Sequence, residues 1–185
     1  MKNEYDYVLV MKVGPQKDET LAEIIERKNK EAIILGGYVY WGYGGVNLPP
    51  SRVQDWIKEL KTKGKTVKVV FIETKSHFRG DNIVDAKEFS EDNISWHQIP
   101  KGTQITVSKY ALKLRNIYES NSILDLNAYE IAAGPSEGNP LSEYLKGQSD
   151  KALARRKENP GIEDGPKIKI AFTADPVEPH AVYLK

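Results

Sequence analysis

The stretch Thr66-Val67-Lys68-Val69-Val70-Phe71-Ile72-Glu73 is the clearest strand in the sequence. Its apolar residues are strongly strand-prone and nearly continuous, a pattern typical of an interior strand. We therefore predict that residues 66–73 run through the middle of a sheet. The polar residues after them leave this strand as a loop, and loops at strand ends commonly carry function.

Helices and strands are also predicted on the N-terminal side of this central strand. A helix that ends at Gly64 precedes it, and Trp56 lies on the apolar face of that helix, so we expect Trp56 in the core. An earlier helix is expected after Thr20, because Thr20 and Glu23 have capping-box spacing and the stem of Lys28 lies on its apolar face. The predicted strands of this region are residues 5–13 and 38–41.

The C-terminal half is predicted from turn signals and apolar periodicity. A helix is expected over about residues 141–157, with a strongly basic end and an interruption at Gly147. A linker over residues 159–166 follows, and turns are expected at Asp175-Pro176 and Glu178-Pro179. Further strands are predicted at residues 83–89, 104–107, 110–117, 168–173 and 181–184.

The order of these elements predicts an α+β fold. We expect a mixed or antiparallel sheet, for which a barrel-like form is one option, with two to three flanking helices. The length of 185 residues suits one domain with a sizeable core. We therefore predict a single α+β ligand-binding domain over residues 1–158, and a linker with a C-terminal hairpin or arm over residues 159–185.

Composition excludes several classes of function. The 27 basic and 26 acidic side chains nearly cancel, so nucleic acid would bind only through a local patch. The chain has no cysteine, which excludes disulfides, thiolate nucleophiles and zinc–thiolate sites. The sequence has neither a signal-peptide pattern nor an apolar run of about 18 residues. We expect a soluble, cytoplasmic protein without membrane association, metal or cofactor, and a homo-oligomer is left open.

The stretch Tyr38-Val39-Tyr40-Trp41-Gly42-Tyr43-Gly44-Gly45 combines aromatic rings with bare backbone. Aromatic faces offer stacking surface, and glycines let a ligand reach main-chain amides, a pairing that suits flat, partly polar molecules such as nucleobases. The stretch is therefore the first candidate for a ligand site. The alternative is a buried strand end followed by a glycine turn.

Further candidates surround this stretch or follow other elements. Polar residues at the next helix start would add selection, and the loop after the central strand would face the same pocket, unless it is only a solvated loop. A basic helix end and the glycine-rich loop before that helix would hold phosphate, unless they are a solvated face and a structural turn. The candidate ligand-binding residues are Trp41, Tyr43, Gly44, Gly45, Asn47, Arg52, Thr74, Lys75, Ser76, Ser136, Lys151 and Arg155.

Residues 41–47, the helix after them, residues 64–71 and the loop at 74–76 together resemble the PUA-like superfamily, particularly its EVE and ASCH members. The resemblance covers about residues 5–117. It implies a small barrel-like sheet with a cleft that accepts a modified base or a related nucleotide. Residues 41–45 also resemble a segment of uncharacterised bacterial and phage proteins, which implies no established function.

We therefore expect a protein that binds a nucleotide-like small molecule without turnover. The ligand would be a modified base, a nucleotide or a nucleotide-derived signal, and the protein would be a reader or a sequestering protein of the kind that phages use against nucleotide signals. The alternative is an enzyme that cleaves such a ligand, with His77, Asp81 or His97 as acid or base. A protein-interaction module with a structural glycine turn is the third option.

Overall fold

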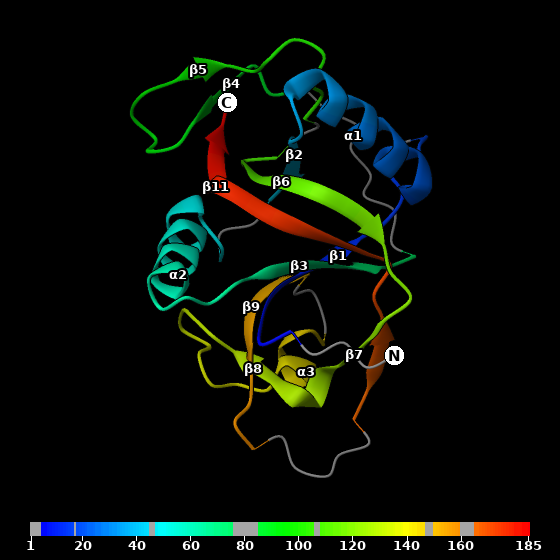
Figure 1. Cartoon of the computed structure of the whole chain (residues 1–185), viewed down its shortest axis with the longest axis vertical. Coiled ribbons are helices and arrows are strands. Elements are labelled where there is room, and N and C mark those ends of the chain that lie inside the picture. Colours follow the sequence, from blue (N-terminus) through cyan, green and yellow to red (C-terminus); the bar gives the residue numbers. More distant parts are fainter. Residues whose placement is uncertain are drawn as a thin grey trace. The chain divides into compact units, whose positions relative to one another are not determined.

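The computed structural model describes residues 5–16, 18–44, 47–75, 85–105, 108–146, 150–159 and 165–185. Within these residues the chain has three α-helices, a mixed nine-stranded sheet and a two-stranded antiparallel sheet (Figure 1). The predicted α+β class is confirmed. The nine-stranded sheet of the described part is not closed, so the barrel-like option is not realised.

The helices and strands have the following bounds. They are β1 (Tyr7–Val13), α1 (Leu21–Leu35), β2 (Val39–Tyr43), α2 (Pro50–Thr62), β3 (Lys68–Glu73), β4 (Glu88–Ser90), β5 (His97–Gln98), β6 (Tyr110–Glu119), β7 (Ile123–Asp125), the 3₁₀-helix η1 (Leu126–Ala128), β8 (Tyr129–Ile131), α3 (Leu141–Tyr144), β9 (Lys151–Arg156), β10 (Lys167–Lys169) and β11 (Phe172–Leu184).

The chain divides into two compact units, each assembled from separate segments. Unit 1 comprises Met1–Val13, Trp56–Thr74 and Tyr118–Ala174, and unit 2 comprises the three remaining segments, Gly14–Asp55, Lys75–Ile117 and Asp175–Lys185. The elements α2, β6 and β11 begin in one unit and end in the other. The sequence predicts a boundary of another kind, between a single domain at residues 1–158 and a C-terminal linker with a hairpin or arm. That boundary stays a prediction.

In unit 1, β3 is an interior strand, as predicted. It pairs in parallel with β1, where Val70 lies opposite Val10, and antiparallel with the first residues of β11, where Val70 lies opposite Thr173. On its other side β1 pairs with β9, which in turn pairs with β8. β3 thus has a partner on both edges, and its consecutive apolar side chains from Val69 to Ile72, which alternate between the two faces of the sheet, are all buried.

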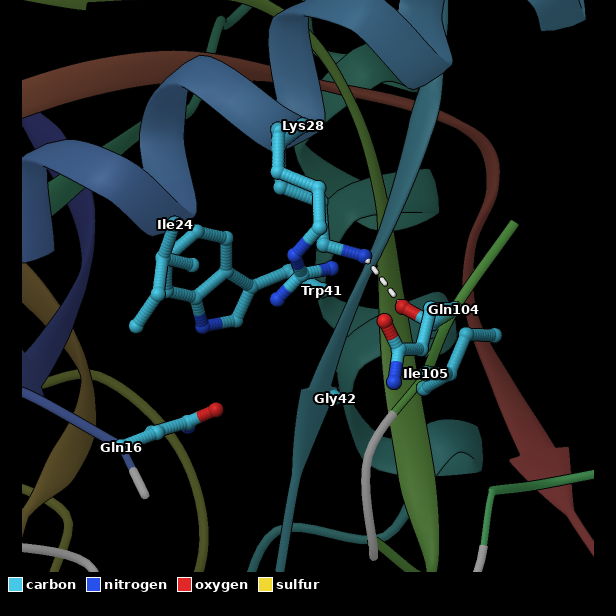
Figure 2. Close-up of a pocket in the computed structure, with 8 residues that line it drawn as sticks. Gln16, Ile24, Lys28, Trp41, Gly42, Gln104 and Ile105 are labelled. Atoms are coloured by element: carbon cyan, nitrogen blue, oxygen red, sulfur yellow. Dashed lines mark hydrogen bonds between the residues drawn. The ribbon is translucent and has the colours of Figure 1, made fainter. Parts of the chain in front are cut away.

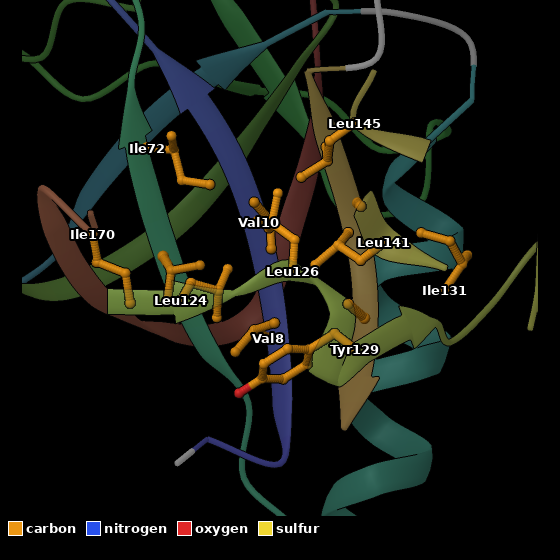
Figure 3. Packing of buried hydrophobic residues seen from close by; sticks show 13 residues of the cluster. Val8, Val10, Ile72, Leu124, Leu126, Tyr129, Ile131, Leu141, Leu145 and Ile170 are labelled. Atoms are coloured by element: carbon orange, nitrogen blue, oxygen red, sulfur yellow. The ribbon is translucent and has the colours of Figure 1, made fainter. Parts of the chain in front are cut away.

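The core of unit 1 lies against one face of these strands. Figure 3 shows Val8 and Val10 of β1 pointing toward Leu124 of β7, Leu126 of η1 and Tyr129 of β8. All five are buried. Burial of such apolar side chains contributes roughly 1.5–3 kcal/mol each, so this cluster is a main source of stability in unit 1.

In unit 2, α1 forms where the sequence predicts it. Thr20 is the N-cap: its hydroxyl accepts from the Glu23 N–H at 3.2 Å, and the Glu23 carboxylate accepts from the Thr20 N–H at 2.8 Å. Gly36 ends the helix with a left-handed φ of 85°. The buried face of α1 includes the predicted Lys28 and, four residues before it, Ile24.

The helix α2 also confirms its prediction. It ends before Gly64, which has a positive φ of 69°. Trp56 is buried, with 7% of its surface exposed, and its ring meets the edge of Tyr7 at 6.5 Å within unit 1. None of the helices in the described residues is long and apolar enough to cross a membrane.

The helix predicted over residues 141–157 is wrong. Among the described residues of this range only α3 is helical, and residues 151–156 form β9, which lies between β1 and β8. Alanine, leucine and arginine favour helices, but propensity is a weak prior. Ala152, Leu153 and Ala154 are all buried, so pairing on both edges of β9 overrides their helical preference.

The predicted turns at Asp175-Pro176 and Glu178-Pro179 are also wrong. A single strand, β11, runs through both prolines. Its first residues pair with β3, and near its other end Tyr183 lies opposite Ser90 of β4. Pairing at both ends therefore continues the strand through residues that usually mark turns.

The remaining strand predictions are partly confirmed. The strand at residues 110–117 is β6, which pairs antiparallel with β2. The segment at 168–173 is divided between β10 and β11, and β4 begins near the end of the segment predicted at 83–89. Residues 104 and 105 are not in a strand, and the rest of the segment predicted at 104–107 lies outside the described residues.

Tyr40 packs against the rings of Tyr38 and Phe89 in unit 2, and its burial there predicts a loss of stability at alkaline pH. Burial, helped by Tyr38 and the negative charge of Glu91, raises the pKa of Tyr40 to about 12 from its ordinary 10.0. Because the neutral phenol is favoured in the folded state, its contribution to stability is complete below pH 10 and is lost as the pH rises toward 12.

We expect Tyr40→Phe to flatten the decline in unfolding free energy that wild type shows above pH 10, as measured by urea titrations from pH 9 to about pH 11. Tyr118→Phe is the matched control, because Tyr118 is exposed. Its pH profile should match that of wild type. Equal profiles for Tyr40→Phe and wild type would contradict the prediction.

Candidate functional site

The aromatic and glycine stretch lies on β2 and immediately after it. Trp41 and Tyr43 have only 5% and 4% of their surface exposed. Tyr43 donates its hydroxyl proton to the Leu48 carbonyl at 2.9 Å, and its ring packs against Tyr110 at 5.4 Å. Burial raises the pKa of Tyr43 strongly. Both rings are therefore part of the buried interior of unit 2 and do not form an open stacking surface.

A small pocket lies beside Trp41, within unit 2 (Figure 2). We call it the Trp41 pocket. Its volume, measured as the space open to the centre of a water molecule, is ≈ 20 Å³. One water-sized group needs roughly 10–15 Å³ on this measure, so the pocket admits a small polar group but not a whole nucleobase. It is lined by Gln16, Ile24, Arg27, Lys28, Trp41, Gly42, Gln104 and Ile105.

Several elements bring these residues together. The helix α1 places Ile24, Arg27 and Lys28 on one face, because positions three and four residues apart are neighbours on a helix. The indole of Trp41 on β2 lies beside Ile24, and the side chain of Gln16 points toward them (Figure 2).

Arg27 is held by two carboxylates. Its Nε and Nη2 donate to the two carboxylate oxygens of Glu19, each at 3.0 Å, and its Nη1 donates to Glu31 Oε1 at 3.2 Å. Burial lowers the pKa of Arg27, but hydrogen bonds and charge from Glu19 and Glu31 outweigh it and leave that pKa raised. Arg27 is therefore a positioned cation whose donors already point to carboxylates.

Lys28 and Glu31 form a buried ion pair beside the pocket. The Lys28 Nζ lies 3.0 Å from Glu31 Oε2, and both side chains are only 5% exposed. Lys28 also donates to the Gln104 carbonyl at 2.8 Å, while the Gln104 N–H donates to Glu31 Oε1 at 3.1 Å. Burial lowers the pKa of Lys28, against the opposing effect of Glu31. Through these two hydrogen bonds the ion pair holds the backbone of Gln104 against α1, beside the pocket.

The candidates near β2 have local roles in the structure. Gly44 follows the strand, and a Cβ added there would meet no atom within 4 Å. Asn47 is exposed, and its carbonyl accepts from Arg52 Nη1 at 2.6 Å. Gly45 and Ser76 lie outside the described residues.

The candidates from the loop after β3 fall in different units. Thr74 belongs to unit 1, where its N–H donates to the Val13 carbonyl at 2.7 Å, and exposed Lys75 belongs to unit 2.

The phosphate candidates all lie in unit 1. Arg155 contacts Glu130 at 2.9 Å and Glu137 at 3.1 Å, and Lys151 lies 2.5 Å from Asp150. Both cations stand on β9 and not on a helix end. Ser136 lies in a turn before α3, which has only four residues. The anion site predicted at this helix start stays a prediction.

The residues predicted for the enzyme alternative are mostly outside the described part of the chain. This applies to His77 and Asp81. His97 is exposed, and its ring lies 5.5 Å from that of Phe89. Among the described residues there is no group of three or more His, Asp or Glu side chains that could hold a metal ion.

Sequence reasoning missed the charged part of the pocket. Lys28 lies on the predicted apolar face of α1, and Glu31 lies on the same face three residues later. Opposite charges with this spacing on a buried face were a usable signal for an internal ion pair. Gln16 and Gln104 carried no such signal, because only tertiary packing brings them to the pocket.

No family model, curated protein or solved structure matches the chain. The resemblance to the PUA-like superfamily stays a prediction.

Proposed function

We propose that the protein binds a nucleotide-like small molecule whose base presents a small polar group to the Trp41 pocket. The observation that supports this most is the lining itself. An indole forms one wall, and Gln16 and Gln104 also line the pocket, where the Gln104 Nε2 donates to Asp85 Oδ1 at 3.5 Å. Carboxamides both donate and accept hydrogen bonds, which matches the mixed donor and acceptor edges of nucleobases.

The size of the pocket limits what enters it. An exocyclic amino group or keto oxygen is about as large as a water molecule, which is what ≈ 20 Å³ accommodates. The ring that carries this group would lie outside the cavity. Such a site discriminates by the group at the base edge, as a reader of a modified base or a nucleotide-derived signal requires.

Binding without turnover is the form of this proposal that the geometry favours. The two ionisable side chains that line the pocket, Arg27 and Lys28, are both engaged by carboxylates. A general base or acid needs a pKa near the working pH and access to a ligand proton. Cations held in this way orient a ligand and its surroundings better than they transfer protons. We therefore propose a reader or sequestering protein.

The proposal is tested by thermal unfolding against nucleobases, nucleosides, nucleotides and cyclic nucleotides. At a ligand concentration tenfold above Kd we expect about 1.4 kcal/mol of stabilisation, a rise in Tm of roughly 3–6 °C, with the ligand intact on chromatography. Formation of product would favour the enzyme alternative. No shift with any ligand would sink the proposal and favour an interaction module.

Gln104→Leu locates the site within this test. The substitution removes the carboxamide but keeps the backbone groups that bond to Lys28 and Glu31. We expect it to abolish most of the ligand-induced shift. Gln98→Leu is the control, because Gln98 is exposed on β5 and does not line the pocket.

A further inference from the structure

Among the described residues, the ionisable side chains that line the Trp41 pocket are balanced in charge by the carboxylates that form ion pairs with them. Arg27 and Lys28 line it, and the carboxylates that bond to them belong to Glu19 and Glu31. This four-residue set has two positive and two negative charges. A pocket that bound phosphate would be expected to keep at least one cation with donors directed at the ligand.

The hydrogen-bond geometry works against an anion. Three of the Arg27 nitrogens donate to carboxylates, two of them to Glu19 in a bidentate arrangement. These three bonds use three of the five guanidinium N–H groups, so a phosphate that reached the other two would still lie close to both carboxylates. Like charges within about 4–6 Å repel strongly in a partly buried site. An uncharged amino or keto group meets no such penalty.

We infer that the Trp41 pocket accepts only an uncharged base edge and excludes anionic groups, so that its ligand class is a nucleobase or nucleoside and any phosphate stays outside. The claim that the ligand is a nucleobase or nucleoside rests on the proposed function. The exclusion of anions follows from the charge set alone, and inorganic phosphate tests it without any base.

Glu19→Gln is the decisive variant. The Glu19 side chain is 38% exposed, so the loss of its charge should be tolerated, and glutamine keeps one acceptor for Arg27. The change leaves the charge set with one net positive charge. Glu26→Gln is the matched control: it removes a carboxylate from the same part of the chain, but Glu26 pairs with Lys30 on the exposed side of α1.

The measurement is Tm in about 20 mM phosphate against chloride at equal ionic strength. We expect no difference for wild type or Glu26→Gln, and a phosphate-specific rise of at least about 1 °C for Glu19→Gln. A phosphate-specific rise in wild type would overturn the inference. The inference would also be overturned if Glu19→Gln showed no phosphate-specific rise, because the Glu19 carboxylate would then not be what excludes the anion.

Matched nucleosides and nucleoside monophosphates separate this inference from the proposed function. If the inference holds, each wild-type pair should bind with affinities within about threefold of each other. Monophosphates that bind more than about tenfold tighter would overturn the inference and leave the proposed function standing. If no base-containing ligand binds while phosphate behaves as expected, the proposed function fails and the anion exclusion stands.

Discussion

Glu31→Ala is expected to lower the free energy of unfolding by about 3–5 kcal/mol, because it breaks a buried ion pair and leaves one charge uncompensated. Glu31 accepts from Arg27 Nη1, Lys28 Nζ and the Gln104 N–H. Without it, the Lys28 ammonium stays buried beside its remaining acceptor, the Gln104 carbonyl. Urea titration at neutral pH measures the loss.

Two further variants make this prediction specific. Glu26→Ala removes a carboxylate from an i,i+4 pair on the same helix, but that side chain is 69% exposed, so we expect a cost of only about 0–0.5 kcal/mol. Lys28→Met combined with Glu31→Leu removes both charges and should restore most of the stability. A Glu31→Ala cost as small as that of Glu26→Ala would show that the pair contributes little.

The elements predicted correctly from sequence are those with strong local signals. The apolar run at residues 66–73 predicts an interior strand because burial on both faces leaves no polar alternation, and β3 confirms it. The capping box at Thr20 and the left-handed Gly36 set the ends of α1 in the same local way.

The errors came from long-range pairing. Residues 151–156 have the composition of a helix, yet they form a strand because β1 and β8 supply partners on both edges. The turns predicted at the two prolines of β11 are wrong for the same reason, because the local sequence does not indicate that this strand pairs with β3 and β4. In each case tertiary context overrides local preference.

The candidate site shows the same division. The stretch that includes Trp41 and Gly42 was identified from sequence, and both residues line the pocket. What the sequence could not predict is which segment would cover the ring. The helix α1 does so, and the Lys28–Glu31 pair then ties Gln104 to the same place. Residues more than 70 positions apart along the chain thus share one wall.

Trp41→Phe should weaken binding of a nucleobase or nucleoside ligand by about tenfold, because it removes part of the aromatic wall while the core stays filled. Trp41→Ala should abolish binding and lower the free energy of unfolding by about 3–5 kcal/mol, since it leaves a cavity in unit 2. The phenylalanine variant keeps the test valid if the alanine variant does not fold.

Trp56→Phe is the matched control for this prediction. Trp56 is as deeply buried as Trp41 but belongs to unit 1 and does not line the pocket. The two phenylalanine variants should lose similar stability, about 0.5–3 kcal/mol each, while only Trp41→Phe loses affinity in a calorimetric titration. Equal affinities for Trp41→Phe and wild type would show that the indole does not contribute to ligand binding. An equal loss of affinity in Trp41→Phe and Trp56→Phe would also contradict the prediction. Trp56 does not line the pocket, so the affinity would then depend on the stability of the whole protein and not on the indole of Trp41.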